Sequence, residues 1–270
     1  MGNLVREPVV AGQFYSAEPE QLKKTLSFYL KSNLEKEKAN GIIVPHAGYV
    51  YSGPVAGAVY ARVKLPETII LLGPNHTGAG KPFSLMAEGT WKTPLGQVEI
   101  ESSLAKEMLK SSGYLKEDTS AHQYEHSLEV QIPFLQMLSS NFKILPIILS
   151  MGNDEDLLRI GEEIAETLLR QKKKTLLIAS SDMTHYESEE SAREKDTYAL
   201  KAILELDEKE LFKRVREKNI SMCGIAPVAV MLAAVKRLGA KEAELVRYQT
   251  SGAITGDRSE VVGYAGVLIK

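Results

Sequence analysis

The sequence predicts an α/β protein with three layers, in which helices cover both faces of a central, mixed sheet. Segments rich in Ile, Leu and Val alternate along the chain with segments of helical periodicity, a pattern typical of layered α/β domains. The inner apolar segments are continuous, as expected of strands buried on both faces. Only a polar turn separates the last two strand-like segments, which indicates an antiparallel pair and therefore a mixed sheet.

Apolar periodicity, and the residues that start or stop it, define the individual elements. Strands are expected in the apolar runs 41–45, 67–73, 142–150, 174–181, 243–251 and 260–270. Helices are expected where apolar residues recur at helical spacing, in 20–32, 54–64, 102–113, 125–139, 153–171, 192–206, 208–218 and 225–239. Pro54 lies near the first turn of its helix, and Gly113 ends another. Pro133 must either kink the segment 125–139 or start a second helix.

Composition narrows the class of protein. A chain of 270 residues with no internal repeat or low-complexity linker is expected to form one domain over residues 1–270. The net charge of −2 gives no broad field to attract nucleic acid or an anionic membrane. The single cysteine cannot form an intrachain disulfide, and neither a secretory signal nor an apolar run of ~18 residues is present. A cytoplasmic location is therefore expected.

Three of the expected strands end in a turn that carries a histidine. His46 follows the first strand and His76 the second, while Asp182 and His185 follow the strand 174–181. The carboxyl ends of parallel strands meet at one edge of an open sheet, where ligands bind, so we expect these side chains to lie close together. Imidazole is the commonest metal ligand and the usual acid or base near neutral pH. The pattern therefore predicts a metal site or a proton-transfer site.

The other two histidines lie in the string His-Gln-Tyr-Glu-His, residues 122–126. This string matches the H-x-x-E-H pattern of inverzincin peptidases. On a helix, His122 and His126 would share one face, and they could hold zinc together with a third ligand and a water molecule. Five-residue patterns also arise by chance. The alternative is the start of a helix at which His and Glu side chains make local hydrogen bonds.

Cys223 directly precedes Gly224 and an apolar helix that has Pro227 near its start. A helix N-terminus lowers the pKa of a thiol and favours the thiolate. A thiolate is a good ligand for Fe, Cu(I) or Zn. The alternative is a buried, inert cysteine that packs as a small hydrophobic residue, and the residues alone favour this alternative.

Five motifs, taken together and in order, resemble the Memo family of the archaeal and bacterial type. They are PHAGYVYSG, LLGPNH, EHSLEVQIPFLQ, SSDMTHY and MCGIAPV. The N-terminal AGQFYSA and the C-terminal YAGV also fit, so the resemblance covers nearly the whole chain. It implies a fold similar to the catalytic subunit of class III extradiol dioxygenases, which hold non-haem Fe(II) with two histidines and a carboxylate.

The resemblance also implies a metal site made of two histidines and a cysteine. The matching positions are His46 in PHAGY, His76 in GPNH and Cys223 in CG. A thiolate in place of the carboxylate gives a softer site, and it exposes an oxidisable sulfur to oxygen chemistry. Ring cleavage is therefore not carried over from the fold. Fe(II) or Cu is the metal expected, ahead of Zn.

Other positions that match the family's motifs are expected to line the same pocket. Asp182 and His185 in SSDMTHY match positions near the metal where the dioxygenases keep an acid/base histidine, and we expect them to be catalytic, with Asp182 orienting His185 through a hydrogen bond. Tyr49, Glu125 and His126 are expected to bind the substrate.

The function expected from these features is a metal-dependent oxidoreductase of unknown substrate. Two alternatives stay open: a zinc-dependent hydrolase, and a non-enzymatic protein that binds a peptide or a small molecule in the same pocket. The resemblance further implies a pathway shared with a radical-SAM protein and an AMMECR-type protein. No nucleic-acid or membrane partner is expected.

Overall fold

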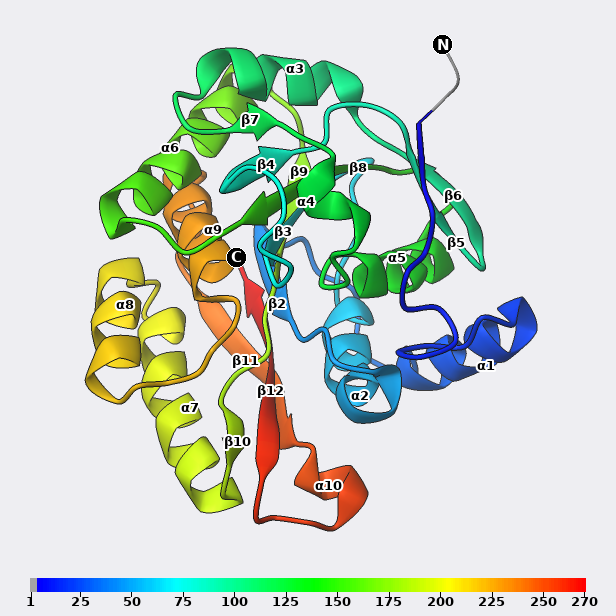
Figure 1. The fold of residues 1–270 in the computed structure, drawn as a ribbon, viewed down its shortest axis with the longest axis vertical. Coiled ribbons are helices and arrows are strands. Elements are labelled where there is room, and N and C mark those ends of the chain that lie inside the picture. The colour runs from blue at the N-terminus through cyan, green and yellow to red at the C-terminus, as the bar shows by residue number, and fades with distance from the viewer. Residues whose placement is uncertain (1–3) are drawn as a thin grey trace.

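Helices cover both faces of a central sheet in the computed structural model, which describes residues 4–270 (Figure 1). The strands are β1 (Val5–Arg6), β2 (Gly41–Val44), β3 (Thr68–Pro74), β4 (Phe83–Leu85), β5 (Thr90–Thr93), β6 (Gly96–Glu99), β7 (Lys116–Glu117), β8 (Lys143–Leu149), β9 (Thr175–Ser180), β10 (His185–Glu187), β11 (Ala243–Thr250) and β12 (Val261–Ile269). The helices are α1 (Pro19–Tyr29), α2 (Tyr49–Tyr60), α3 (Ser102–Ser111), α4 (Ser120–Gln123), the 3₁₀ helix η1 (Glu129–Gln131), α5 (Ile132–Leu138), α6 (Asp154–Gln171), α7 (Glu189–Leu204), α8 (Glu208–Glu217), α9 (Ile225–Arg237) and α10 (Gly252–Thr255). The predicted three-layer α/β/α class is confirmed.

Within the described residues, the main sheet has nine strands. Eight of them follow the order β10-β12-β2-β9-β3-β8-β4-β7, and β11 pairs with β12. The central strands β2, β9, β3 and β8 are parallel to their neighbours in this set, whereas β12 pairs antiparallel with β2, β10 and β11. The sheet is therefore mixed, and the antiparallel pair β11–β12 was correctly predicted. A separate sheet, β1-β5-β6, holds the start of the described chain.

Side chains of the central strands alternate between two hydrophobic cores. In β3, Ile70 and Leu72 pack on the face covered by α3 and α6 to α9. Ile69 and Leu71 of the same strand pack on the face covered by α1, α2 and α5. Every residue of β3 is buried. A strand with apolar neighbours on both faces needs apolar side chains at every position, which explains the continuous Ile/Leu runs.

One helix begins earlier than expected, and the structure decides between the two alternatives for Pro133. Helix α2 begins at Tyr49 and contains Pro54 in its interior, although Pro54 was expected near its first turn. Its first turn is formed by the carbonyl of Gly48, which accepts from the N–H groups of Tyr51 and Ser52. In the segment 125–139 the proline starts a second helix, because Pro133 lies in the first turn of α5, where no N–H is needed.

Several short elements were not predicted, namely β1, β4 to β7, β10, α4 and α10. Segments of two to four residues carry too little periodicity for either pattern to show. Among residues 4–270, no helix combines the length and the apolar character needed to cross a bilayer.

Helices α6 and α9 approach each other closely at Gly161. A Cβ atom at this position would lie 2.4 Å from the Val230 carbonyl oxygen, which belongs to a backbone that cannot easily move. We therefore expect Gly161→Ala to lower the free energy of unfolding by about 1–3 kcal/mol, despite the better helix propensity of alanine. Gly113→Ala is the control, because the nearest atom to its Cβ would be Glu163 Oε1 at 3.9 Å. Urea denaturation measures both changes, and a stable Gly161→Ala protein would contradict this account of the helix contact.

Candidate metal centre

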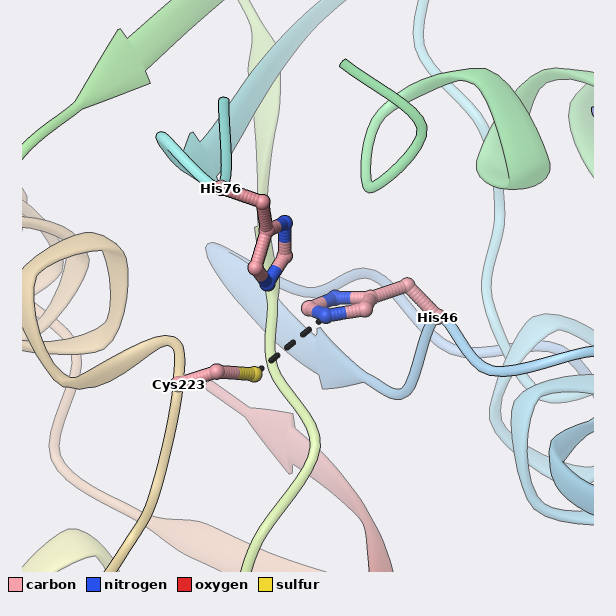
Figure 2. Close-up of side chains that lie close together, drawn as sticks. All are labelled: His46, His76 and Cys223. Carbon is pink, nitrogen blue, oxygen red and sulfur yellow. Dashed lines mark hydrogen bonds between the residues drawn. The ribbon is translucent and has the colours of Figure 1, made fainter. Parts of the chain in front are cut away.

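The ends of three adjacent parallel strands bring the predicted site residues together. His46 follows β2, His76 follows β3 and Asp182 follows β9, and β9 lies between the other two strands in the sheet. Cys223 comes from the segment before α9. Figure 2 shows the side chains of His46, His76 and Cys223 pointing toward one another. Of the four side chains expected at this edge, His46 lies close to His76 and its N–H donates to Asp182, whereas the His185 ring contacts the Ser221 carbonyl.

A glycine and an asparagine shape the turn that carries His76. A Cβ atom on Gly73 would lie 2.6 Å from Ser127 Oγ, so only glycine lets the end of β3 approach the segment around Ser127 so closely. The Asn75 side chain then closes the turn: its Oδ1 accepts from the Gly78 N–H at 2.8 Å, and its Nδ2 donates to the Ala79 carbonyl at 2.8 Å. These contacts explain why the sequence Gly73-Pro74-Asn75 directly precedes this histidine.

Cys223 is held against the end of β9 by a second close approach. A Cβ atom on Gly224 would lie 2.3 Å from Ser181 Cβ, and the Gly224 N–H donates to Ser181 Oγ at 3.1 Å. The Cys223 sulfur accepts from the Asp182 N–H at 3.3 Å, and His46 Nε2 lies 3.3 Å from the same sulfur. The glycine after the cysteine is therefore a steric requirement of this contact.

The three side chains have the geometry of a metal site. One potential ligand atom from each of His46, His76 and Cys223 lies within 4.8 Å of the others. A tetrahedral ion with metal–nitrogen bonds of about 2.0 Å and a metal–sulfur bond of about 2.3 Å holds its ligand atoms at separations below this limit. The His46 side chain is buried, whereas His76 is 31% exposed, so the site can be reached from the side of His76.

A second group, made of His76, Glu125 and His126, also meets the distance limit. Its carboxylate is already occupied, because Glu125 accepts hydrogen bonds from the His76 N–H, from His76 Nδ1 and from the Ser127 N–H. Burial alone would raise the pKa of Glu125, but these bonds and the charge of His76 lower it to about 2. Glu125 therefore directs the proton of His76 to Nδ1 and leaves Nε2 free for a metal.

His126 completes the surroundings of the two histidine ligands. Its ring stacks on His76 with 4.7 Å between centroids and lies edge-on to His46 at 5.5 Å. Burial is the main cause that lowers its pKa. His126 thus lies beside His46 and His76, and Glu125 is fully buried and contacts His76 instead of open space for a substrate.

The inverzincin hypothesis is wrong. Helix α4 ends at Gln123, so His122 and His126 do not share a helical face. His122 is fully buried near Trp91, neither of its ring nitrogens has a partner, and it belongs to neither group of possible ligands in the described chain. Burial lowers its pKa to about 4, so the ring is neutral near pH 7.

Asp182 and His185 do not form the expected hydrogen-bonded pair. Asp182 accepts from the His46 N–H at 2.8 Å, whereas His185 Nδ1 lies 2.8 Å from the Ser221 carbonyl and donates to it. The Ser221 hydroxyl also accepts from the His185 N–H, so this residue, which sequence reasoning missed, orients the imidazole. Burial raises the pKa of Asp182 to about 6, with the His46 N–H acting in the opposite direction.

Burial decides between the two alternatives for Cys223 and corrects the expectation for Tyr49. The pKa of Cys223 is raised by burial and by the nearby Asp182 charge, not lowered by the following helix. The thiol is therefore neutral unless a cation takes the place of its proton. Tyr49 was expected to bind substrate, but it is 4% exposed, donates to the Val130 carbonyl at 2.6 Å and stacks on Tyr15. It packs in the core and supports α2.

Sequence reasoning also missed the groups behind His46. The Nδ1 atom of His46 lies 2.9 Å from Ser180 Oγ, which in turn contacts Gln131 Nε2 at 2.9 Å. Ser180 belongs to the SSD motif, which offered a weak signal. Gln131 is distant in sequence from both residues and sits in a segment with helical periodicity, so nothing in the sequence pattern connects it to the site.

The fold and this site define a class, an α/β/α protein with a His₂Cys cluster at the carboxyl edge of its parallel strands. The family model for Memo-like protein matches residues 6–268. MEMO1 family proteins of Methanopyrus kandleri, Methanococcoides burtonii and Aquifex aeolicus are 41%, 44% and 44% identical to this chain; each match covers 98% of this chain and 99%, 100% and 98% of the relative, respectively. The chain therefore belongs to the Memo family.

A solved structure supports the fold alone. An uncharacterized protein of Escherichia coli K12 superimposes with a TM-score of 0.58 and 12% sequence identity, covering 86% of this chain and all of that one. At this identity the likeness shows only the arrangement of strands and helices.

His122 makes the stability of the protein depend on pH. Its pKa is about 4 in the folded protein and about 6.5 when unfolded, so acid protonates the unfolded chain first. The contribution of His122 to the free energy of unfolding is fully present above about pH 6.5 and declines as the pH falls toward 4. As the pH falls over this range, we expect the free energy of unfolding of His122→Leu to rise relative to that of wild type by on the order of 3 kcal/mol. Urea unfolding of both proteins at pH 7.5, 6, 5 and 4.5 tests this, and a constant difference between them would refute it.

Proposed function

We propose that this protein is a metal-dependent oxidoreductase whose Fe or Cu is held by His46, His76 and Cys223. The observation that carries the proposal is the convergence of these three ligand atoms, with His46 Nε2 and the Cys223 sulfur 3.3 Å apart. The donor set fits the metal, because two imidazoles and a thiolate suit soft, redox-active ions. Three protein ligands leave at least one coordination position for a substrate or for oxygen.

The metal, when bound, would supply electron transfer, and the surrounding side chains would manage protons. His185 is oriented for this role, since its Nδ1 is fixed on the Ser221 carbonyl and its Nε2 is left available. The Asp182 carboxyl, with a pKa of about 6, changes protonation close to neutral pH. We therefore assign His185 and Asp182 to proton transfer as separate groups, each held by its own backbone partner.

The substrate of this site is a small molecule or a peptide. Its reacting group approaches the metal from the side of His76, whose side chain is partly exposed. Within this proposal, a radical-SAM protein and an AMMECR-type protein act in the same pathway. The zinc-dependent hydrolase and the binding module become outcomes of the experiment below.

Metal content after purification tests the ligand assignment. We expect about one Fe or Cu per chain in wild-type protein purified anaerobically without chelator, and a loss of at least tenfold in His46→Ala and in Cys223→Ser, because each removes one of three ligands. His185→Ala is the matched control and should keep its metal, since this imidazole faces Ser221. Elemental analysis gives all four values.

Each other result has a defined meaning. Stoichiometric metal in both ligand variants would refute the site. Zinc as the bound metal, without redox cycling, would favour the hydrolase. No metal in the purified protein, and no uptake of added Fe(II) or Cu(I), would leave a Memo-family fold that binds ligands without metal chemistry.

A further inference from the structure

We propose that Ser180 and Gln131 form a tautomer lock, which keeps the proton of the neutral His46 ring on Nδ1 and leaves Nε2 unprotonated before any metal arrives. Both residues are fully buried, as is Tyr60, which holds Gln131 from the other side. The consequence for metal binding rests on the proposed function. The protonation pattern itself concerns only residues of this chain and can be tested without a metal.

The orientation of the Gln131 amide is the first step. One end of the amide lies 3.0 Å from the Pro45 carbonyl oxygen, and a carbonyl can only accept a hydrogen bond. This end must therefore be the NH₂ group. The other end, Oε1, accepts from the Tyr60 hydroxyl at 3.0 Å. The amide nitrogen consequently also faces Ser180 Oγ, at 2.9 Å, as a donor.

The single hydroxyl proton of Ser180 is the second step. Ser180 Oγ lies 2.7 Å from the Ser127 carbonyl oxygen, which can only accept, so the proton points there. One lone pair of the hydroxyl oxygen takes the hydrogen bond from Gln131 Nε2. The remaining lone pair faces His46 Nδ1 at 2.9 Å. Only a protonated Nδ1 can complete this arrangement, and the ring then carries a lone pair on Nε2.

The opposite tautomer breaks the network. With the proton on Nε2, Ser180 would have to turn its hydroxyl toward Nδ1. The buried Ser127 carbonyl would then keep only a contact of 3.4 Å from Gln131 Nε2. If the hydroxyl stayed in place, two lone pairs would face each other. Either result leaves a buried polar group without a good partner, which is costly in the absence of water.

The lock prepares one atom for coordination. His46 Nε2 lies 3.3 Å from the Cys223 sulfur, on the side where the three ligands converge (Figure 2). A protonated Nε2 could not bind a cation. The Nδ1 atom of His76 has a similar partner, the Glu125 carboxylate. The partner of His46 is a neutral hydroxyl, which avoids placing a second charge behind this buried ring.

Nitrogen NMR on metal-free protein tests the lock directly. The protein is labelled with ¹⁵N-histidine, treated with chelator and recorded at pH 8, and the His46 signals are assigned from their absence in His46→Gln. We expect the wild-type ring to carry its proton on Nδ1, and Ser180→Ala to show a mixture of tautomers or mainly the Nε2–H form. Ser84→Ala is the control, because Ser84 is equally buried and hydrogen-bonded but donates to the Lys81 carbonyl, away from the ligands.

Metal affinity gives a second readout. Competition between the protein and a chromogenic chelator for Co²⁺ should show a loss of about 10–100-fold in Ser180→Ala, none in Ser84→Ala and a recovery in Ser180→Thr, which restores the hydroxyl. Tyr60→Phe, which removes only the anchor of Gln131, should show a smaller loss. If circular dichroism shows that Ser180→Ala is unfolded, the tautomer of the His46 ring in the NMR spectrum of Tyr60→Phe tests the lock instead.

The outcomes separate this inference from the proposed function. An Nε2–H ring in wild type, or an unchanged Nδ1–H ring in every folded variant that breaks the network, would overturn the lock. Wild-type protein that shows the Nδ1–H ring but binds no Co²⁺, Fe(II) or Cu(I) would uphold the lock and refute the metal site. A loss of affinity equal in Ser84→Ala would mean that general destabilisation causes the effect, and would also overturn the lock.

Discussion

The parallel pairing of β9 with β2 on one side and β3 on the other is the constraint on which the site depends. In this register Val44 lies opposite Ser180, and Leu72 lies opposite Ala179, so the three strands end at nearly the same level. Each following turn then brings one polar side chain to a common edge. A slip of one residue would move each side chain of a strand into the opposite core, where the packing differs, and this disfavours the slip.

A second set of contacts holds the segment that carries Glu125 in place. Arg6 forms an ion pair with the buried Glu129 and donates to the backbone carbonyls of His122 and Glu125. Glu129 in turn accepts from the Tyr15 hydroxyl and from two backbone N–H groups of the N-terminal segment. These bonds satisfy a fully desolvated pair, which by its charges alone would be costly. The N-terminal segment, including Tyr15 of the AGQFYSA motif, therefore supports the loop that orients His76.

Much of this architecture could be predicted from the sequence because it follows from local patterns. Continuous apolar runs identify the buried strands. Because these strands are parallel, the histidines that follow them are expected to lie close together at one edge of the sheet. The groups that hold the rings of His46 and His185 could not be predicted, because Ser180, with Gln131 behind it, and Ser221 meet these rings only through tertiary contacts. Of the two alternatives for Cys223, the raised pKa agrees with the buried thiol that the residues alone favoured, since burial outweighs a helix N-terminus. Cys223 itself was identified by family resemblance, not by spacing.

Within the proposed function, the electrostatics of the site connect folding with metal binding. Burial disfavours the thiolate of Cys223, so in the absence of a cation the folded protein keeps the thiol proton, while burial raises the pKa of Asp182 only to about 6. A divalent cation reverses this preference, because it replaces the thiol proton and attracts the neighbouring carboxylate. His46 needs no such change in the proposed tautomer lock, since its hydrogen bond to Ser180 leaves Nε2 free. Metal uptake should therefore release a proton from the cysteine and add its binding free energy to the stability of the three strand ends.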